Sequence, residues 1–510
     1  MTAGWARLAS PRPERRQVTD EIVTTSAGAV RGVRDGGVSR FLGIPYAAAP
    51  VGENRFAAPQ AVEPWAGVRD ATQPGPNAPQ VGGAFPGLDI APLVGAGWVK
   101  GDDYLNVNIW TPDCAAKGLP VMVWIHGGGF VGGAAFVAAH DGTAFAKSGV
   151  VLMSITYRLG IEGFLPIDGA PTNLGLRDQI AGLAWAKQNA AAFGGDPSNI
   201  TVFGESAGAM SIGDLVASPL AQGLFQKAII ESGHGAMVRP IHVNRRLTAK
   251  IASKAGVKPD RAGFASLSLE DSVRAMAAAQ APSFRVDLRD ETGRNPSYGL
   301  SRFLPVFGDD VLPERPHDAM AKGVGKDIHV LIGANAEEMN LYFVPTGVRD
   351  KINGLLAWFM VSRSVKNAWR ILKAYGLGKK GQKAGDVMTR AMSDLVFRYP
   401  TRQFAAAHQG ATHVYDFAWR SPAWGGQLGA CHGVEVPFVF NTLACATGPQ
   451  GVLGDAPPQA LADSVHKVWV DFAASGRLPW PEYDAKSRVV YALADGTAGA
   501  DPPMPAAKFV

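Results

Sequence analysis

The pentapeptide Gly-Glu-Ser-Ala-Gly at 204–208 constrains the fold of this chain more than any other stretch. An apolar run, 200–203, precedes it, and a pattern of small and apolar residues, 209–215, follows it. A short run rich in β-branched and aromatic residues is typical of a buried strand, so the order predicts a strand, a tight turn and a helix. Such a turn exposes the hydroxyl of Ser206 at a helix N-terminus, where developing negative charge is stabilised. The pentapeptide alone is a weak signal in a glycine-rich chain, but this context makes Ser206 a candidate nucleophile.

Length and composition allow a large core and indicate no strongly charged partner. The chain has 510 residues, 47% of them hydrophobic, which suits one long α/β unit with insertions. A net charge of +5, from 49 basic and 44 acidic residues, is too small to indicate nucleic-acid binding. We also expect no cluster of Lys and Arg with interleaved aromatic residues.

The cysteines and the apolar segments bear on compartment and cofactors. Cys114, Cys431 and Cys445 have neither metal-ligand spacing nor an even disulfide framework, so we expect a reduced, cytoplasmic setting. We separately expect that the protein needs no metal or organic cofactor. Residues 1–20 lack the apolar core of a secretory signal. The apolar window 121–139 contains five glycines beside a strand pattern, so we interpret it as a strand and a loop and expect no membrane span.

The hydrophobic pattern predicts an α/β architecture. Residues 1–19 are expected to form a flexible segment and 20–510 a single domain that begins with an antiparallel meander over 20–46. Residues 45–98 are rich in Pro and Gly and predict an ordered loop. Apolar strand-like runs then recur at 107–110, 121–125, 150–155, 200–203, 228–230, 328–332 and 413–417. Because helical patterns, such as 174–193, separate them, a mostly parallel sheet covered on both faces is predicted.

Two further segments are helical and lack strand patterns. Residues 240–300 and 345–410 are interpreted as insertions that form the walls or lid of a pocket, and 460–475 as a C-terminal helix.

A serine hydroxyl needs an oxyanion hole to act as a nucleophile on a carbonyl. The motif His-Gly-Gly-Gly-Phe at 126–130 directly follows a predicted strand. Consecutive glycines allow backbone N–H groups to turn toward an oxyanion without a Cβ in the way. We expect the donors to be the N–H groups of Gly128, Gly129 and Ala207.

The serine also needs an orienting acid. Glu337 and Glu338 lie just past the predicted strand 328–332, at the edge of the sheet where α/β sites lie. We choose Glu338, with Glu337 as the alternative.

A general base is also required. We look for it after the acid in the sequence, because proteins with this strand–serine–helix turn carry the serine, the acid and the histidine in that order along the chain. His408, His413, His432 and His466 qualify. His413 lies in a predicted strand and His466 in a predicted helix, where a structural role is expected. His432 lies in a loop between two glycines and is free to present its ring, so we choose His432.

Several longer motifs add a resemblance to a known family. They are Phe-Leu-Gly-Ile-Pro-Tyr-Ala at 41–47, Asp-Tyr-Leu-Asn-Val-Asn at 103–108, the segment 120–130, Tyr-Arg-Leu-Gly at 157–160, Asn-Leu-Gly-Leu-Arg-Asp-Gln at 173–179, the segment 193–209 and His-Gly-Val-Glu-Val-Pro-Phe at 432–438. With them the chain resembles the type B carboxylesterases, in the bacterial p-nitrobenzyl-esterase-like branch of the cholinesterase family. The resemblance implies an α/β-hydrolase fold, a Ser206–His432–Glu338 triad and the oxyanion hole named above.

The same resemblance implies supporting contacts. Ser232 is expected to contact Glu338, and Glu205 to support the site beside Ser206. The family's structural ion pairs correspond to Arg55–Asp102 and Arg158–Asp178. Tyr104 stands where family members have a cysteine, so the disulfide of the secreted animal members cannot form.

These expectations describe a serine hydrolase that cleaves a small-molecule ester through an acyl-enzyme. Alternatives are a carbamate or amide hydrolase with the same triad, a lipase, and a non-catalytic cholinesterase-like binding protein. A monomer or a homodimer fits equally. Aromatic residues that are candidates to line the pocket are Phe130, Phe136, Tyr342, Phe343, Trp419 and Trp424.

Overall fold

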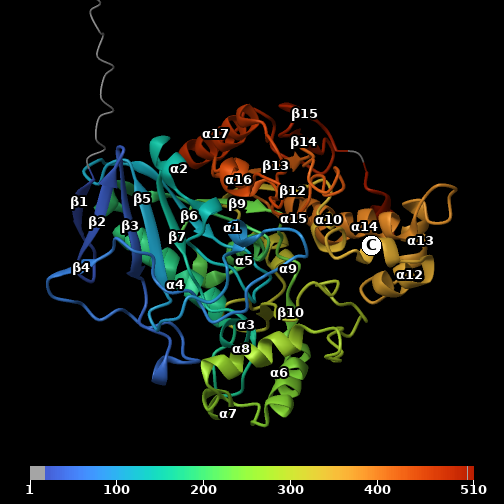
Figure 1. Ribbon diagram of the computed structural model, residues 1–510, viewed down its shortest axis with the longest axis horizontal. Helices are drawn as coiled ribbons and strands as arrows, with labels where there is room; N and C mark the ends of the chain where they lie inside the picture. The colour runs from blue at the N-terminus through green and yellow to red at the C-terminus, as the bar shows by residue number, and fades with distance from the viewer. Residues whose placement is uncertain (1–17, 502, 510) are drawn as a thin grey trace, which may run out of the picture.

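A computed structural model describes residues 18–501 and 503–509, and a large twisted sheet forms its centre (Figure 1). Its strands lie in the order β1-β2-β3-β5-β7-β6-β8-β9-β12-β13-β14-β15, with β4 paired to β2. The bounds are β1 (Thr19–Thr24), β2 (Ala29–Asp35), β3 (Val38–Pro45), β4 (Val68–Asp70), β5 (Asn106–Thr111), β6 (Leu119–Ile125), β7 (Val151–Ile155), β8 (Gly195–Glu205), β9 (Lys227–Glu231), β12 (His329–Asn335), β13 (Thr412–Phe417), β14 (Val489–Ala492) and β15 (Thr497–Ala500). A separate two-stranded sheet pairs β10 (Arg239–Pro240) with β11 (Val306–Phe307).

The middle of the large sheet is parallel, as predicted. Strands β7, β6, β8, β9, β12, β13 and β14 run in one direction. The predicted meander over 20–46 is confirmed as the antiparallel strands β1 to β3. Strand β1 begins at Thr19, inside the segment expected to be flexible, and residues 1–17 of that segment lie outside the described residues.

Helices cover both faces of the sheet and form two insertions. Those next to the sheet are α2 (Thr143–Lys147), α4 (Leu174–Asn189), α5 (Ala207–Ala217), α16 (Val436–Val439) and α17 (Gln459–Ser475). The first insertion holds α6 (Ile241–Ala255), α7 (Arg261–Ala265) and α8 (Leu269–Gln280). The second holds α11 (Val348–Lys351), α12 (Gly354–Ser362), α13 (Ala368–Ala374), α14 (Ala384–Ser393) and α15 (Tyr399–Ala407), and α15 also packs against β12 and β13 of the sheet. The short helices α1 (Ala91–Val94), α3 (Gly160–Phe164), α9 (Pro316–Ala321) and α10 (Asn340–Phe343) complete the set.

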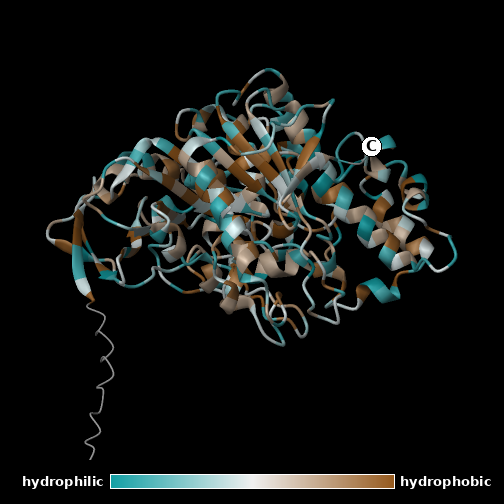
Figure 2. Ribbon diagram, turned by 90° about the horizontal axis from the view of Figure 1, so that it is seen from above, coloured by the Kyte–Doolittle hydropathy of each residue, from teal (hydrophilic) through white to brown (hydrophobic). Residues whose placement is uncertain are grey.

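Strand β6 illustrates how the sequence places the core on both faces of the sheet. Val121, Val123 and Ile125 belong to the apolar cluster that contains residues of α4 and α5. The alternate residues Met122 and Trp124 belong to the cluster that contains residues of α2 and α17. All five side chains are fully buried. Because successive side chains of a strand point to opposite faces of the sheet, a strand covered on both faces must be apolar at every position. Figure 2 shows that the strands at the centre of the molecule are largely hydrophobic.

A buried ion pair joins loop and helix beside this core. Arg158 and Asp178 are almost fully buried, and their side chains lie 2.7 Å apart, as expected. The expected Arg55–Asp102 pair is wrong, because the guanidinium of Arg55 instead binds the carboxylate of Glu162 at 2.8 Å. Glu162 lies on α3, which the sequence pattern did not predict.

Within residues 18–501 and 503–509, the helices are all too short or too polar to cross a bilayer.

Candidate active site

Ser206 lies in a strained turn between β8 and α5. Its backbone has φ 57° and ψ −121°, a combination that L-residues rarely adopt. Gly208 explains why small residues flank it, since a Cβ at this position would lie 2.0 Å from the carbonyl oxygen of Ile125 on β6. The pentapeptide therefore brings strand and helix together and holds the serine hydroxyl at the first turn of α5.

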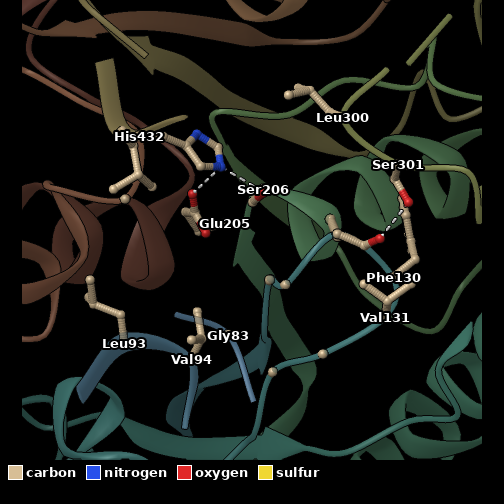
Figure 3. A pocket seen from close by; sticks show the side chains of 18 of the residues that line it. Gly83, Leu93, Val94, Phe130, Val131, Glu205, Ser206, Leu300, Ser301 and His432 are labelled. Carbon is tan, nitrogen blue, oxygen red and sulfur yellow. Dashed lines mark hydrogen bonds and ion pairs between the residues drawn. The ribbon is translucent and has the colours of Figure 1, made fainter. Parts of the chain in front are cut away.

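The base and the acid predicted from sequence lie in line with this hydroxyl. The Nε2 atom of His432 is 2.7 Å from the Oγ of Ser206. On the other side of the ring, Nδ1 is 2.6 Å from the carboxylate of Glu338. Glu338 is held in turn, because its other oxygen accepts a hydrogen bond of 2.7 Å from the backbone N–H of Asn335. Figure 3 shows the ring of His432 directed at Ser206.

The two adjacent glutamates face different partners. Glu338 is completely buried against His432. Glu337 instead forms an ion pair with the exposed Arg420 and accepts a hydrogen bond of 3.0 Å from the N–H of Ala430. Of the two, Glu338 is therefore the one in contact with the imidazole.

The imidazole is packed as well as hydrogen-bonded. The ring of Phe397 lies 4.7 Å from that of His432, and the ring of Tyr342 lies 5.6 Å away. Phe397 comes from the helical insertion over 345–410, so this insertion contributes to the wall of the site. Only the fold reveals this contact, because the two residues are far apart in sequence.

The glycine-rich loop after β6 faces Ser206. Gly128 has φ 115°, and a Cβ there would lie 2.1 Å from the carbonyl oxygen of Gly132, so only glycine fits. Gly128, Gly129 and Ala207 all line the same cavity as Ser206. Ala207 is the first residue of α5, so its N–H has no partner within the helix.

A hydrogen bond from a distant loop fixes this glycine-rich segment. The hydroxyl of Ser301 donates to the carbonyl oxygen of Gly129 at 2.8 Å (Figure 3). The carbonyl of Ser301 accepts a hydrogen bond of 3.3 Å from the buried guanidinium of Arg239. Neither residue was predicted from the sequence, since no local motif marks them.

Carboxylates dominate the electrostatics of the site. Glu205 lies 3.1 Å from the Nε2 of His432. Burial lowers the pKa of His432, but the charges of Glu205 and Glu338 outweigh it and raise that pKa to about 9. Burial in turn raises the pKa of Glu205, partly offset by His432.

Ser232 does not have the expected partner. Its hydroxyl donates a hydrogen bond of 3.3 Å to Glu435, and not to Glu338. The side-chain amide of Asn335 binds the second oxygen of Glu435. Burial, together with the charges of Glu205 and Glu338, raises the pKa of Glu435. Ser232 therefore supports a buried carboxyl group behind the site.

The site opens into an apolar cavity of about 280 Å³. Of the aromatic candidates, Phe130 and Tyr342 line it, together with Phe85 and Phe397, which were not predicted. Further apolar lining residues are Ile90, Leu93, Val94, Met210, Met237, Leu300, Leu304, Leu341 and Val436. Within the part of the chain that the structure describes, no three His, Cys, Asp or Glu side chains are grouped to hold a metal ion.

A mostly parallel sheet with a strained serine turn after a central strand places the molecule among the α/β-hydrolases. Residues 19–499 match the model of the Carboxylesterase family, and the chain belongs to that family. It is an ester-hydrolysing enzyme.

Individual relatives agree with this assignment over most of their lengths. The chain is 35% identical to the para-nitrobenzyl esterase of Bacillus subtilis (strain 168), covering 92% of this chain and 94% of the relative. Identity to the cholinesterase of Mus musculus is 32%, over 92% of this chain and 81% of that protein. A solved structure of PNB esterase superposes with a TM-score of 0.82 at 31% identity, over 96% of this chain and all of the other.

Proposed function

We propose that this enzyme cleaves small carboxylic esters through an acyl-enzyme in which Ser206 is the nucleophile. The supporting observation is the unbroken line of contacts from the Oγ of Ser206 through both ring nitrogens of His432 to Glu338. In this geometry the imidazole can remove the proton of the serine hydroxyl, while the carboxylate holds the imidazole in the tautomer that this requires.

These contacts suggest the order of the chemical steps. The Nε2 of His432 takes the hydroxyl proton as Oγ forms a bond to the ester carbonyl carbon. The N–H groups of Gly128, Gly129 and Ala207 stabilise the resulting oxyanion, and Glu338 stabilises the imidazolium. The tetrahedral intermediate expels the alkoxide, which leaves as the alcohol with the proton from Nε2. A water molecule, deprotonated by the same nitrogen, then releases the carboxylic acid and restores Ser206.

The cavity supports an ester with modest apolar groups on either side of the carbonyl. Its volume of about 280 Å³ lies near the lower end of small-molecule sites, and its lining is largely apolar. The same residues would attack a carbamate or an amide, whose cleavage differs in the fit and departure of the leaving group.

A panel of aryl and alkyl esters, carbamates and amides tests the proposal. We expect turnover of short esters, with Ser206→Ala lowering kcat by about 10⁴-fold or more while circular dichroism remains unchanged. A folded Ser206→Ala variant with wild-type turnover would contradict the proposal, and preferential carbamate turnover would favour that alternative.

Two matched variants test whether Glu338 or Glu337 is the acid that orients His432. Glu338→Gln removes the carboxylate that fixes the imidazole tautomer, so we expect kcat/KM to fall by roughly 10²–10⁴-fold. Glu337→Gln replaces the neighbouring carboxylate, which contacts Arg420, and we expect a change of less than about threefold. Equal losses in the two variants would show that the assignment of Glu338 is wrong.

A further inference from the structure

Helix α12 exposes apolar side chains that a water-facing helix would not carry. Its nine residues are apolar apart from Gly354 and Ser362. Leu355 is 72% exposed and Phe359 50%, and Trp369 on α13 is 48% exposed. Among the described residues, five of the fourteen exposed large hydrophobic side chains lie between 355 and 369, namely Leu355, Leu356, Trp358, Phe359 and Trp369.

The buried side of α12 accounts for only part of its apolar character. Ala357 and Val361 are buried in the main hydrophobic core, which satisfies the inner face of the helix. A helix that is apolar on all sides is normally buried on all sides. Contiguous exposed apolar residues instead mark a surface that contacts a partner or a membrane.

The same segment carries a large excess of positive charge. Residues 351–383 contain eight Lys and Arg and no acidic residue, which leaves 41 basic against 44 acidic residues elsewhere. The expectation that no basic cluster with interleaved aromatics exists is therefore wrong for this segment, because a small net charge conceals a local excess. The eight are Lys351, Arg363, Lys366, Arg370, Lys373, Lys379, Lys380 and Lys383.

These cations are available to an external partner. Within residues 18–501 and 503–509, none of the eight lies within ion-pair distance of a carboxylate. Two of them lie beside the exposed aromatic rings. The guanidinium of Arg363 is 5.8 Å from the ring centre of Phe359, and the ammonium of Lys373 is 5.8 Å from that of Trp369.

The position of the segment suits contact with a broad surface. In Figure 1, α12 and α13 form the end of the molecule farthest from strands β1 to β4. We use the name α12–α13 face for a set of exposed side chains on this segment. They are Leu355, Trp358, Phe359 and Trp369, with the neighbouring cations Arg363 and Lys373.

We propose that the α12–α13 face docks the enzyme on a membrane surface that contains anionic lipids. Leucine and phenylalanine side chains can enter the acyl region, tryptophan prefers the interface, and Lys and Arg bind the anionic headgroups. A single strand of nucleic acid would suit the cations and aromatic rings, but it offers no apolar phase for Leu355 and Leu356. A second copy of the chain would bring the same excess of positive charge to both sides of a two-fold interface.

Cosedimentation of the full-length chain with vesicles tests this proposal. One set of vesicles contains phosphatidylcholine and phosphatidylserine in roughly equal amounts, and the other contains phosphatidylcholine alone. We expect the enzyme to sediment with the anionic vesicles, to remain in the supernatant with the neutral ones, and to dissociate as salt is raised.

Two double variants separate the apolar and the charged contributions. Trp358→Ser with Phe359→Ser, and Arg363→Glu with Lys373→Glu, should each weaken binding to anionic vesicles by about tenfold or more. The matched control is Lys250→Glu with Lys254→Glu, which makes the same charge change at exposed positions of α6, and we expect it to bind nearly as wild type. Melting temperature and turnover of a water-soluble ester report whether each variant is folded.

Three outcomes would overturn the proposal. The first is equal binding to neutral and anionic vesicles, and the second is wild-type binding by both variants of the face. The third is an enzyme that is dimeric without vesicles and becomes monomeric with Trp358→Ser and Phe359→Ser, which would assign the face to a second copy.

Discussion

In the proposed mechanism, the reactivity of Ser206 depends on the charge state of the imidazole of His432. His432 acts as a base only when it is neutral, yet Glu205 and Glu338 raise its pKa to about 9. Activity should therefore rise as the pH increases through the pKa of His432. A carboxylate oxygen of Glu205 lies 3.1 Å from the Nε2 of His432. A substitution of Glu205 therefore removes one of the two charges and leaves the proposed acid, Glu338, in place.

We predict that Glu205→Gln moves the acidic limb of the profile of kcat/KM against pH to lower values by about one unit. The reason is that a neutral amide no longer favours the imidazolium, so the pKa of His432 falls. The profile is measured with a soluble ester whose own ionisation does not change over the range. An unshifted limb, with the variant folded, would show that Glu205 does not set this pKa.

At the same scale, the sequence identified some residues and not others for physical reasons. Ser206 and His432 lie in local patterns whose glycines reveal the backbone they require. Glu337 and Glu338 are neighbours in the same sequence context. Only the position of the His432 ring in the folded protein shows which of the two contacts it. Ser232 was given the wrong partner because its contact with Glu435 joins segments about two hundred residues apart.

At the scale of elements, the turn between β8 and α5 depends on close approach to β6. We predict that Gly208→Ala lowers both activity and stability, because its Cβ would lie 2.0 Å from the carbonyl oxygen of Ile125. The expected loss in kcat is roughly tenfold to a hundredfold, with a lower melting temperature.

Gly499→Ala is the matched control for this substitution. A Cβ at Gly499 meets no atom within 4 Å, so we expect wild-type activity and stability. Equal behaviour of the two alanine variants would contradict the argument from close approach.

Which elements could be predicted depended on how strongly burial shapes their sequence. The central strands are buried on both faces, so their apolar runs were recognised without the structure. Strand β15 is exposed throughout and β14 is short, and neither was predicted. The insertions were expected to be helical, but their contribution of Phe397 to the site depends on tertiary packing.

At the scale of the whole molecule, buried ion pairs join segments that the sheet does not connect. Arg158 binds Asp178 on α4 and also donates a hydrogen bond of 2.7 Å to the carbonyl oxygen of Ala57 in the long N-terminal loop. The pair therefore anchors this loop to a helix beneath the sheet.

We predict that Asp178→Asn lowers the free energy of unfolding by about 3–5 kcal/mol, because Arg158 would remain buried without its counter-charge. The control is Asp471→Asn, which breaks the exposed Lys467–Asp471 pair and should cost less than about 1 kcal/mol. Chemical denaturation measures both, and similar losses would refute the distinction between the buried and the exposed pair.

The general architecture was predictable because parallel strands, glycine turns and helical periodicity are local signals. The basic segment 351–383 is visible in the sequence itself but was overlooked, since a net charge of +5 averages it with a slightly acidic remainder.

The intact mass of the protein after reaction with a fluorophosphonate, followed by peptide mapping, tests whether Ser206 is the activated nucleophile. We predict one adduct per chain, located on Ser206, and none on a folded Ser206→Ala variant. A folded wild-type chain that gains no adduct, or that gains it at another residue, would contradict the assignment of Ser206 as the activated nucleophile.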